Sequence, residues 1–324
     1  MHRIVLDIPE GDRPAPRIAS VIEPRLSSET GRTARPKPDY VSDGKPPERC
    51  ILCDSPHFLG SSPINDGWSM YICSDCETGT TSPVPTAVQA AQVNVDRYPL
   101  DETIATYLSR MREFRARWAQ LLRYLPRRPN SILDVGCSAG FFLDYASTQG
   151  IPRCAGVEIN EALRSWGRTT LGLDIRPTID DFRDEEFDAV LFQDSLEHIA
   201  SPIAALSLAG TRTSEDGVVF VQLPNRRSQM ARVAGPRWPW FSAPDHLMHL
   251  TPRGIEVAAK RCGLSILSVR TCDARVDLLE TLYPWLFPGH LRRLRTFPGF
   301  GQFWVRHGAK GGLIQAIMRP PARG

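Results

Sequence analysis

Two pairs of cysteines near the start of the chain could hold a metal ion. In the sequence of 324 residues, the pairs Cys50-x2-Cys53 and Cys73-x2-Cys76 are separated by nineteen residues, a spacing typical of zinc sites with four thiolates. Two such turns can place four sulfur atoms tetrahedrally around one ion, and a site closed by four sulfurs is structural. The alternative is a pair of disulfides, which are unusual in a cytosolic enzyme. We therefore expect these four cysteines to bind a structural zinc ion.

A glycine-containing turn is the second feature that could do chemistry. It occurs in the segment Ile132-Leu-Asp-Val-Gly-Cys-Ser-Ala-Gly-Phe-Phe-Leu143. A short apolar run ends there in small residues and leads into a helical pattern, which brings backbone N–H groups and a positive helix end close to a ligand. Glycine is needed where a ligand approaches the main chain, because a Cβ would block it. The segment predicts a ligand-binding turn between a buried strand and a helix.

Three chemistries compete for the motif Gly136-x-Ser138-x-Gly140. A hydrolase nucleophile elbow would use Ser138, but the chain has no His-Gly-Gly-Gly oxyanion segment and only a cysteine cluster and one long helix upstream. A dinucleotide fingerprint needs a third glycine further along. S-adenosylmethionine (SAM) fits better, because Asp134 suits an ammonium group. Glu158, at the end of the next strand, can accept both ribose hydroxyls.

With these residues, the chain resembles the class I SAM-dependent methyltransferases from about residue 95 to 320. The family's acidic-x-Gly-x-Gly-x-Gly loop becomes Asp134-x-Gly136-x-Ser138-x-Gly140. Serine replaces the middle glycine, which costs little if that position keeps an ordinary backbone angle. The resemblance implies an α/β fold with a Rossmann-like, seven-stranded, mainly parallel sheet and an antiparallel last strand. Later segments match the family in order, at Phe187–Ile199, Gly217–Asn225 and His246–Pro252.

The resemblance also implies which residues bind SAM. Most of them lie at the carboxyl ends of strands, where ligands bind in open parallel sheets. We expect Cys137 to matter through its backbone N–H rather than its sulfur. Asp180 or Asp181 stands where the family contacts adenine, and the alternative there is a solvated acidic loop. The full predicted set is Asp134, Gly136, Cys137, Ser138, Gly140, Glu158, Ile159, Asp181, Gln193 and Asp194.

Histidines near the same strand ends could serve as a catalytic base. The sulfonium already makes the methyl group electrophilic, so the enzyme mainly has to align an acceptor. A hydroxyl acceptor must lose its proton during transfer, and histidine suits that task. His246 is our first choice and His198 the second, with His249 nearby. The alternative for each is a structural role in a helix cap or in the core.

The elements around these residues define a domain plan. Residues 1–46 are rich in proline and are expected to be a disordered tail, followed by a zinc ribbon at 47–82 and the methyltransferase domain at 83–324. Apolar residues from Ile104 to Leu125 repeat at helical spacing. An insertion at 273–307 separates the last two strands. It could be a substrate lid, a dimer contact or a patch for an amphipathic or anionic substrate, but we favour a helical flap on the sheet edge.

Composition limits the partners. Lys plus Arg number 39 and Asp plus Glu 36, so neither a strong nucleic-acid surface nor a membrane-binding field is expected. The amino terminus has too short an apolar core for a signal peptide, and no apolar run approaches the length of a membrane span. We expect a cytoplasmic protein.

The acceptor is inferred from the ribbon. A ribbon before a class I domain resembles methyltransferases of sugars, polysaccharides or secondary metabolites, and also ribosomal RNA guanine methyltransferases with a zinc module. In the RNA enzymes the later ligand pair usually includes a histidine, whereas here it is Cys73 and Cys76. The near-neutral charge also argues against RNA. We expect a small-molecule or sugar acceptor, methylated on a hydroxyl. The alternatives are an RNA base methyltransferase and a catalytically inactive SAM-binding or assembly scaffold.

Overall fold

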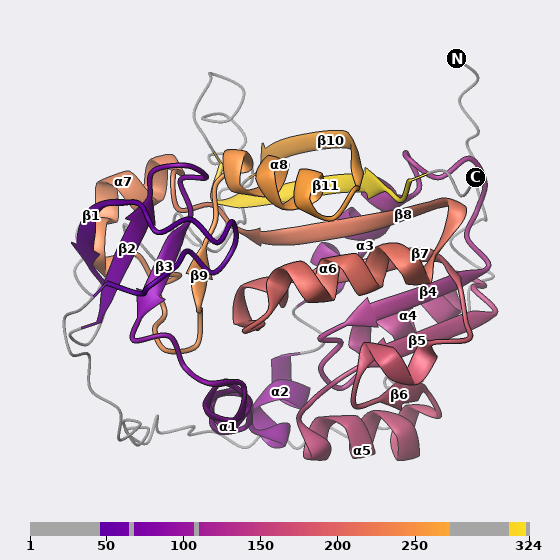
Figure 1. Cartoon of the computed structure of the whole chain (residues 1–324). Helices are drawn as coiled ribbons and strands as arrows, with labels where there is room; N and C mark the ends of the chain where they lie inside the picture. Colours follow the sequence, from indigo (N-terminus) through magenta and orange to yellow (C-terminus); the bar gives the residue numbers. More distant parts are fainter. Residues whose placement is uncertain (1–45, 65–67, 107–109, 273–310, 322–324) are drawn as a thin grey trace, which may run out of the picture.

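A seven-stranded sheet forms the centre of the fold. The computed structural model describes residues 46–64, 68–106, 110–272 and 311–321 (Figure 1). The strands follow the order β10-β11-β8-β7-β4-β5-β6 across the sheet. Their bounds are β4 (Ser131–Val135), β5 (Arg153–Val157), β6 (Asp174–Arg176), β7 (Phe187–Gln193), β8 (Thr213–Pro224), β10 (Ser265–Cys272) and β11 (Leu313–Arg319).

All strands of this sheet except the last one in sequence run in the same direction. Neighbours from β8 to β6 pair in parallel, and β11 pairs antiparallel with both β8 and β10. Parallel neighbours need long crossover connections, which the intervening helices supply. The carboxyl ends of β4, β5, β7 and β8 therefore meet at one edge of the sheet. The predicted Rossmann-like α/β class with an antiparallel last strand is confirmed.

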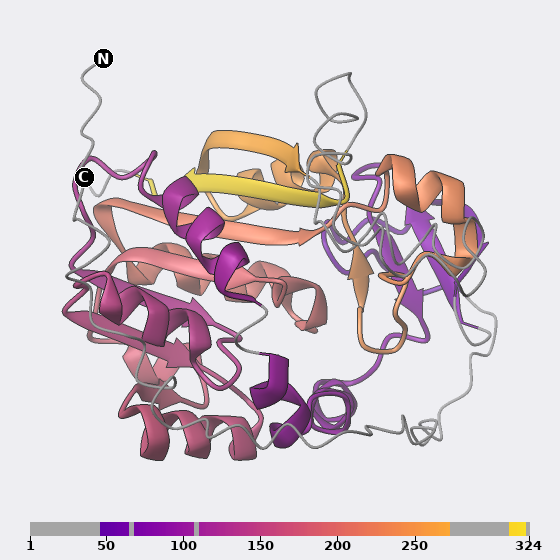
Figure 2. The same ribbon diagram turned by 180° about the vertical axis from the view of Figure 1, so that it is seen from behind.

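Helices cover both faces of this sheet. In β4, Ile132 packs into the core formed with α3 and α4, whereas its neighbour Leu133 packs into the core formed with α6 and α8. Phe220 and Val219 divide in the same way in β8. This alternation is what a pleated strand produces, and burial on both faces explains why the strands are almost wholly apolar. Figures 1 and 2 show the two layers, with α6 (Pro202–Arg212) and α8 (Pro252–Arg261) on one face and α3 (Met111–Leu121), α4 (Phe141–Thr148) and α5 (Glu161–Leu171) on the other.

A second sheet of four antiparallel strands has the order β1-β2-β3-β9. Its first three strands come from the cysteine-containing segment, but β9 comes from the segment just before α8. In this pairing Gly79 is opposite His249 and Thr80 is opposite Met248. A two-residue strand has no periodicity, so the sequence did not predict this pairing. The bounds are β1 (Phe58–Pro63), β2 (Ser69–Cys73), β3 (Gly79–Ser82) and β9 (Met248–His249).

The small sheet packs directly on the methyltransferase-like part of the chain. Leu52 and the buried cysteines belong to the same apolar core as Ile255 and Ala258 of α8. At the start of α8, a Cβ on Gly254 would lie 2.7 Å from the hydroxyl oxygen of Thr78. This close approach leaves no room for a larger residue, so the start of α8 and the cysteine-containing segment are tightly fitted.

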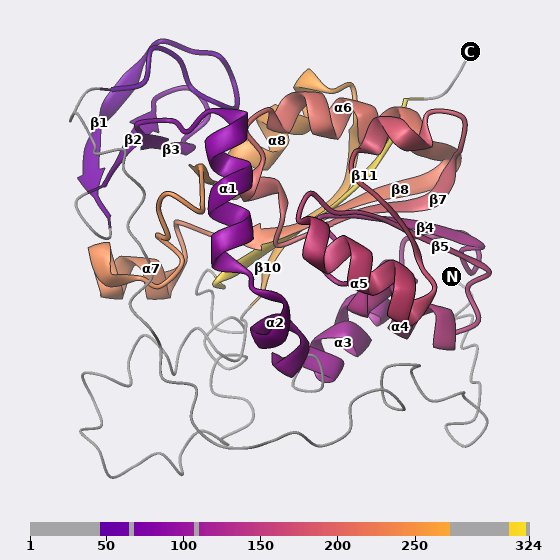
Figure 3. The ribbon, with the colours of Figure 1, turned by 90° about the horizontal axis from the view of Figure 1, so that it is seen from below.

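Helices α1 (Ala87–Arg97), α2 (Leu100–Thr106) and α3 lie between β3 and β4 in the chain, and Figure 3 shows α1 and α2 below the two sheets of Figure 1. Helix α1 begins with a capping box in which the side chains of Thr86 and Gln89 accept each other's backbone N–H. Helix α2 follows it. The apolar repeat from Ile104 to Leu125 is helical in both of its described parts, α2 and α3. Residues 107–109, between these two helices, lie outside the described residues.

Several predicted features lie outside the described residues. They are the 273–307 insertion and the 1–46 tail except for its last residue. The boundaries proposed for the ribbon, 47–82, and for the domain at 83–324 stay predictions. Among the described helices, none is long and apolar enough to cross a membrane. The short elements are α7 (Gln229–Ala234), η5 (Ile179–Phe182), η6 (Leu196–His198) and η7 (Gly235–Arg237).

Candidate active site

The loop from Gly136 to Gly140, which we call the glycine loop, joins β4 to α4. Gly136 has a φ of 80° and Gly140 a φ of 83°, a region that favours glycine. A Cβ on Gly136 would lie 2.5 Å from the Cβ of Ser195, and one on Gly140 would lie 2.5 Å from a methyl carbon of Leu173. Both glycines are therefore required by the backbone conformation and by the surrounding space.

Ser138 corrects one expectation from the sequence. It was expected to replace a glycine cheaply if it kept an ordinary backbone angle, but its φ is 55°. A residue with a side chain in this left-handed region costs about 1 kcal/mol relative to glycine. The loop therefore stores a small strain at this position. Its backbone N–H donates to Oε2 of Glu158 at 2.9 Å, which helps to hold the strained conformation.

The N–H groups of the glycine loop already have partners in the protein. Gly136 and Cys137 both donate to the carbonyl of Val157, at 2.8 and 3.0 Å, and Gly140 donates to the carbonyl of Cys137 at 3.0 Å. These bonds tie the loop to the end of β5. The N–H of Cys137 is thus used to shape the loop, and its side chain is buried.

Asp134 ends up buried at the carboxyl end of β4 with one oxygen unused. Only 3% of the residue is exposed. Its Oδ2 accepts a hydrogen bond from Nε2 of Gln193 at 3.1 Å, whereas its Oδ1 has no hydrogen-bond partner among the described residues. Burial raises the pKa of Asp134 to about 7, although the bond from Gln193 and the charge of Arg117 act in the opposite direction. A buried carboxylate with a free oxygen can receive a cationic group.

Glu158 lies directly after β5 and faces the glycine loop. Its Oε2 accepts from the N–H of Ser138, and its Oε1 accepts from the N–H of Asn160 at 2.7 Å. Burial raises the pKa of Glu158, while these backbone bonds counteract the effect. Each carboxylate oxygen can accept a second bond, so the group is held in one orientation and still has capacity for hydroxyl donors.

The two other predicted residues near this edge differ in their surroundings. Ile159 follows Glu158 and is 54% exposed, which is unusual for a large apolar side chain beside a buried carboxylate. Asp181 lies in η5, where its carboxylate accepts from the N–H and the hydroxyl of Thr178. These bonds lower the pKa of Asp181. The side chain of Asp181 therefore already caps its own turn.

Gln193 and Asp194 end β7 and are joined to a buried arginine that the sequence did not single out. Nη1 of Arg117 in α3 lies 3.4 Å from Oε1 of Gln193, and its Nη2 pairs with the carboxylate of Asp194. Burial opposes ionisation of Asp194, but the charges of Arg117 and Arg110 lower its pKa. No local pattern marks Arg117, because it lies in an amphipathic helix far away in sequence. Its pairing with Asp194 satisfies that carboxylate.

A second group of titratable side chains follows β7. Glu197, His198 and His246, here called the Glu–His cluster, offer ligand atoms that all lie within 4.8 Å of one another. The ring centroids of the two histidines are 4.7 Å apart. Glu197 is 1% exposed, and neither of its carboxylate oxygens has a hydrogen-bond partner among the described residues. Both histidines were predicted from the sequence but Glu197 was not, although Glu197 directly precedes His198.

The two histidines of this cluster differ in charge. Burial opposes protonation of His198, but the carboxylate of Asp245 outweighs it and raises the pKa of His198 to about 9. Burial and the nearby charge of His198 lower the pKa of His246 to about 4. Burial also raises the pKa of Glu197 to about 8. At neutral pH and without a bound ion, His198 is therefore a cation and His246 is neutral.

Tyr98, at the end of α1, links the two groups of side chains. Its hydroxyl donates to Oδ2 of Asp245 at 3.2 Å, and its carbonyl lies 3.4 Å from Nδ2 of Asn160. Its ring packs edge-on against His198, with centroids 6.1 Å apart. Asn160 in turn donates its N–H to Glu158. Tyr98 thus connects the Glu–His cluster with Glu158, through Asn160.

Comparison with known proteins identifies the family. The Methyltransferase domain family matches residues 107–269. The chain belongs to this family. It is a SAM-dependent methyltransferase, and its sheet has the strand arrangement that the resemblance implied.

Individual relatives of the methyltransferase are distant. The ubiquinone biosynthesis O-methyltransferase of Paracidovorax citrulli (strain AAC00-1) is 24% identical over 166 residues, covering 48% of this chain and 67% of the relative. The enzyme of the same name from Stutzerimonas stutzeri (strain A1501) is 24% identical over 165 residues, covering 47% and 66%. The matched part thus spans about two thirds of each relative. The solved structure of the cyclase SpnF is 15% identical, with a TM-score of 0.51, and covers 74% of this chain and 99% of its own; it shows the fold alone.

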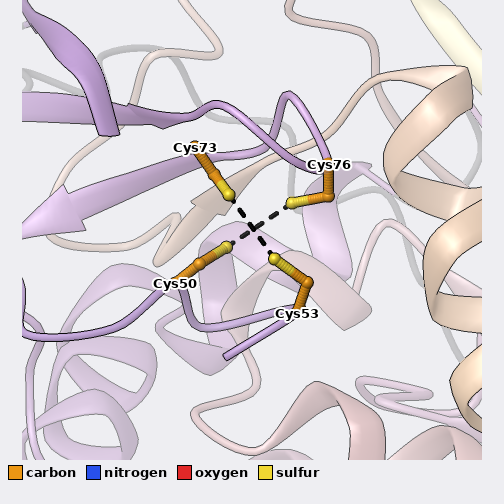
Figure 4. Close-up of side chains that lie close together, drawn as sticks. All are labelled: Cys50, Cys53, Cys73 and Cys76. Atoms are coloured by element: carbon orange, nitrogen blue, oxygen red, sulfur yellow. Dashed lines mark hydrogen bonds between the residues drawn. The ribbon is translucent and has the colours of Figure 1, made fainter. Parts of the chain in front are cut away.

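The four cysteines of the methyltransferase converge on one point, as the spacing predicted (Figure 4). Their sulfur atoms all lie within 4.8 Å of one another, with 3.5 Å between Cys50 and Cys76 and 3.4 Å between Cys53 and Cys73. None of the four is in a disulfide. The N–H of Asp75 points at the sulfur of Cys73, at 3.4 Å.

The strand that follows these cysteines contacts the segment that contains His246. Thr81 in β3 donates its hydroxyl to the carbonyl of His246 at 2.7 Å and lies 3.1 Å from Nε2 of His249. The N–H of Thr81 donates to the carbonyl of Leu247 at 3.0 Å. Burial lowers the pKa of His249 well below its usual value, so this ring is neutral. His249 therefore has a structural role in the contact between the small sheet and the site.

Proposed function

We propose that this methyltransferase transfers the methyl group of SAM to a hydroxyl group of a small-molecule, sugar or secondary-metabolite acceptor. The observation that carries the proposal is the arrangement at one sheet edge. There, a buried carboxylate with a free oxygen, Asp134, and a fixed carboxylate, Glu158, flank the glycine loop. The Glu–His cluster lies beyond the end of the neighbouring strand. The names of the two relatives, both O-methyltransferases, agree with an oxygen acceptor.

In this proposal the predicted residues hold SAM along the carboxyl ends of the strands. Asp134 receives the ammonium group through its free Oδ1, and Glu158 accepts hydrogen bonds from the ribose hydroxyls. The exposed side chain of Ile159 packs on the adenine ring, with Asp181 at the edge of that subsite. Gly136, Cys137, Ser138 and Gly140 shape the loop, and Gln193 at the end of β7 donates to Asp134. Asp194, the next residue, fixes Arg117 beside them.

The acceptor hydroxyl meets the methyl group beside the Glu–His cluster. Nδ1 of His246 lies 2.9 Å from the carbonyl of Trp240, so that nitrogen carries the proton and Nε2 keeps its lone pair. His246 is therefore the proposed base when no ion is bound. His198, the second candidate, pairs with Asp245 and is better suited to stabilise, as a cation, the negative charge that develops on the reacting oxygen. Binding aligns the acceptor with the methyl group, which is the main catalytic task.

We also propose that Cys50, Cys53, Cys73 and Cys76 hold one structural zinc ion. Four sulfur atoms within 4.8 Å of one another fit tetrahedral coordination. Reduced thiols of this kind suit a cytoplasmic protein. Elemental analysis is expected to find one zinc per chain, and Cys73→Ser should lower it substantially. Wild-type protein without zinc would contradict the assignment.

The cofactor part of the proposal is tested by calorimetric titration with SAM. Glu158→Ala should weaken SAM binding by more than about tenfold, because the ribose hydroxyls lose their acceptor and the loop loses the bond from Ser138. Glu215→Ala is the matched control, since Glu215 is an exposed residue in β8. Equal affinities for the two variants would sink the assignment of Glu158.

The acceptor part is tested with methyl-labelled SAM. Label should enter hydroxyl-bearing small molecules, such as phenols or sugars, as an alkali-stable methyl ether. Label in ribosomal RNA would favour the RNA alternative and overturn the proposal. SAM binding without transfer to any of these pools would instead favour the inactive scaffold. His246→Ala and His198→Ala measured in the same assay separate the two histidines. If both keep full turnover with the identified acceptor, the base assignment is wrong.

A further inference from the structure

The Glu–His cluster combines a carboxylate and two imidazoles in a buried place. Ligand atoms of Glu197, His198 and His246 lie within 4.8 Å of one another, a separation that a single ion can bridge. Glu197 is 1% exposed and its two carboxylate oxygens lack hydrogen-bond partners in the part of the chain that the structure describes. Such an orphaned buried carboxyl costs free energy unless something binds it.

Both histidines are held in the manner of metal ligands. Nδ1 of His198 lies 3.0 Å from Oδ1 of Asp245 and 2.9 Å from the carbonyl oxygen of the same residue. Nδ1 of His246 lies 2.9 Å from the carbonyl oxygen of Trp240. An imidazole that donates one ring N–H to an oxygen acceptor is fixed in orientation, and its other nitrogen becomes a better ligand. Nε2 of each ring is therefore the atom left for the cluster.

We infer that Glu197, His198 and His246 form a site for one divalent transition-metal ion, bound by one carboxylate and two Nε2 atoms. Imidazole ligands favour ions such as Fe²⁺ and Zn²⁺ over Mg²⁺ and Ca²⁺, and the carboxylate ligand also suits Mn²⁺. Three protein ligands leave at least one coordination position open, in contrast to the closed four-cysteine site. The carboxylates of Glu197 and Asp245 balance the charge of the ion, and Arg97 and Tyr98 contact Asp245 from the other side.

The open coordination position gives the ion a role in the proposed methyl transfer. This role rests on the proposed function. An acceptor hydroxyl bound to the ion becomes more acidic, as metal-bound water does. Its proton leaves to solvent, and the oxygen attacks the methyl carbon as the bond from carbon to sulfur breaks. In this state the lone pair of His246 binds the ion and is not a base. The cluster thus activates the acceptor oxygen in one of two ways: through a bound ion, or through His246 as a base when no ion is bound.

The binding itself is tested without any acceptor. The full chain with its zinc in place is titrated with Mn²⁺, and free Mn²⁺ is measured by its electron paramagnetic resonance. One Mn²⁺ should bind per chain, with nitrogen couplings from histidine in pulsed spectra. Glu197→Gln and His246→Gln should each weaken binding by at least about tenfold. Glu256→Gln, an exposed carboxylate in α8, is the control and should bind as the wild type does.

Each outcome bears on the inference. Wild-type protein that leaves all Mn²⁺ free, or bound Mn²⁺ without nitrogen couplings, would overturn it, as would wild-type affinity in Glu197→Gln. If Glu197→Gln fails to fold, His246→Gln and the wild-type spectra still decide. Calorimetric binding of SAM to each variant checks its folding. Mn²⁺ binding with no methyl transfer would sink the proposed function alone, whereas transfer without Mn²⁺ binding would leave His246 as the base.

Discussion

Nδ1 of His198 lies 3.0 Å from Oδ1 of Asp245, and both side chains are almost completely buried. Asp245 also accepts from the hydroxyl of Tyr98 and pairs with Arg97, so it connects α1 to the Glu–His cluster. Asp245, a loop residue that follows a proline, therefore organises the Glu–His cluster. Four predictions test this arrangement and the rest of the site.

Removing the charge of Asp245 should destabilise the protein. Asp245→Asn leaves His198 buried without its counter-ion, and breaking such a pair costs about 3 kcal/mol. The pKa of His198 is raised to about 9, so the stabilisation is complete below pH 6.5 and disappears as the pH rises through 9. Urea unfolding of protein with no added divalent metal should show this decline for the wild type and not for the variant. Parallel pH profiles for both proteins would contradict the prediction.

SAM binding should depend on the ionisation of Asp134. The pKa of Asp134 is raised to about 7 in the free protein, and only the ionised carboxylate attracts an ammonium group. Raising the pH from 6 to 7.5 should therefore tighten SAM binding by roughly eightfold, in proportion to the ionised fraction. Isothermal titration at several pH values measures this. Asp134→Asn should bind weakly with little response to pH, and a flat wild-type profile would argue against the contact with the ammonium group.

The space around Gly136 can be separated from its backbone angle. Gly136→Ala suffers both a positive φ and a collision with the Cβ of Ser195, which is held by its own bond to the carbonyl of Val135. Gly263→Ala has a similar φ of 68° but nothing within 4 Å of the added carbon. Strain should lower the stability of each variant by about 1 kcal/mol. Gly136→Ala should lose further stability through the collision and should also weaken SAM binding at least about tenfold, whereas Gly263→Ala should bind SAM normally. Equal behaviour in thermal unfolding and calorimetry would rule out the steric role.

The hydroxyl of Thr81 should matter for turnover more than for cofactor binding. Thr81→Val removes the donor to the carbonyl of His246 at little change in volume, at a cost of about 1–3 kcal/mol. Turnover should fall several-fold while SAM affinity stays within about twofold. Thr80→Val is the control, because Thr80 is equally buried and its hydroxyl has no hydrogen-bond partner among the described residues. If both variants have the same turnover, the contact has no functional role.

Local patterns predicted the backbone around the glycine loop and the cysteine cluster well. The strand, turn and helix around Gly136 and Gly140, the acidic end of β5 and the converging cysteines were all legible from residue type and spacing. These features are encoded within short segments, where periodicity and glycine placement report directly on the backbone.

The rest of the site depends on contacts between distant parts of the chain. Arg117 is 77 residues from Asp194, and Tyr98 is 147 residues from Asp245. Neither pair has a local signature, and each became visible only when α1 and α3 were placed against the sheet. The pairing of β3 with β9 was missed for the same reason. Ser138 shows the remaining difficulty, since its residue type did not reveal its left-handed backbone.

The two-residue strand β9 makes the order of assembly matter. The large sheet that holds the proposed cofactor residues is built from residues 131–319, whereas the wall behind His246 also needs β3, which precedes all of them in the chain. If the four cysteines hold zinc as proposed, loss of the ion would loosen β3 and with it the contacts of Thr81 with His246 and His249. Metal supply during synthesis would then affect whether the newly made chain completes this wall.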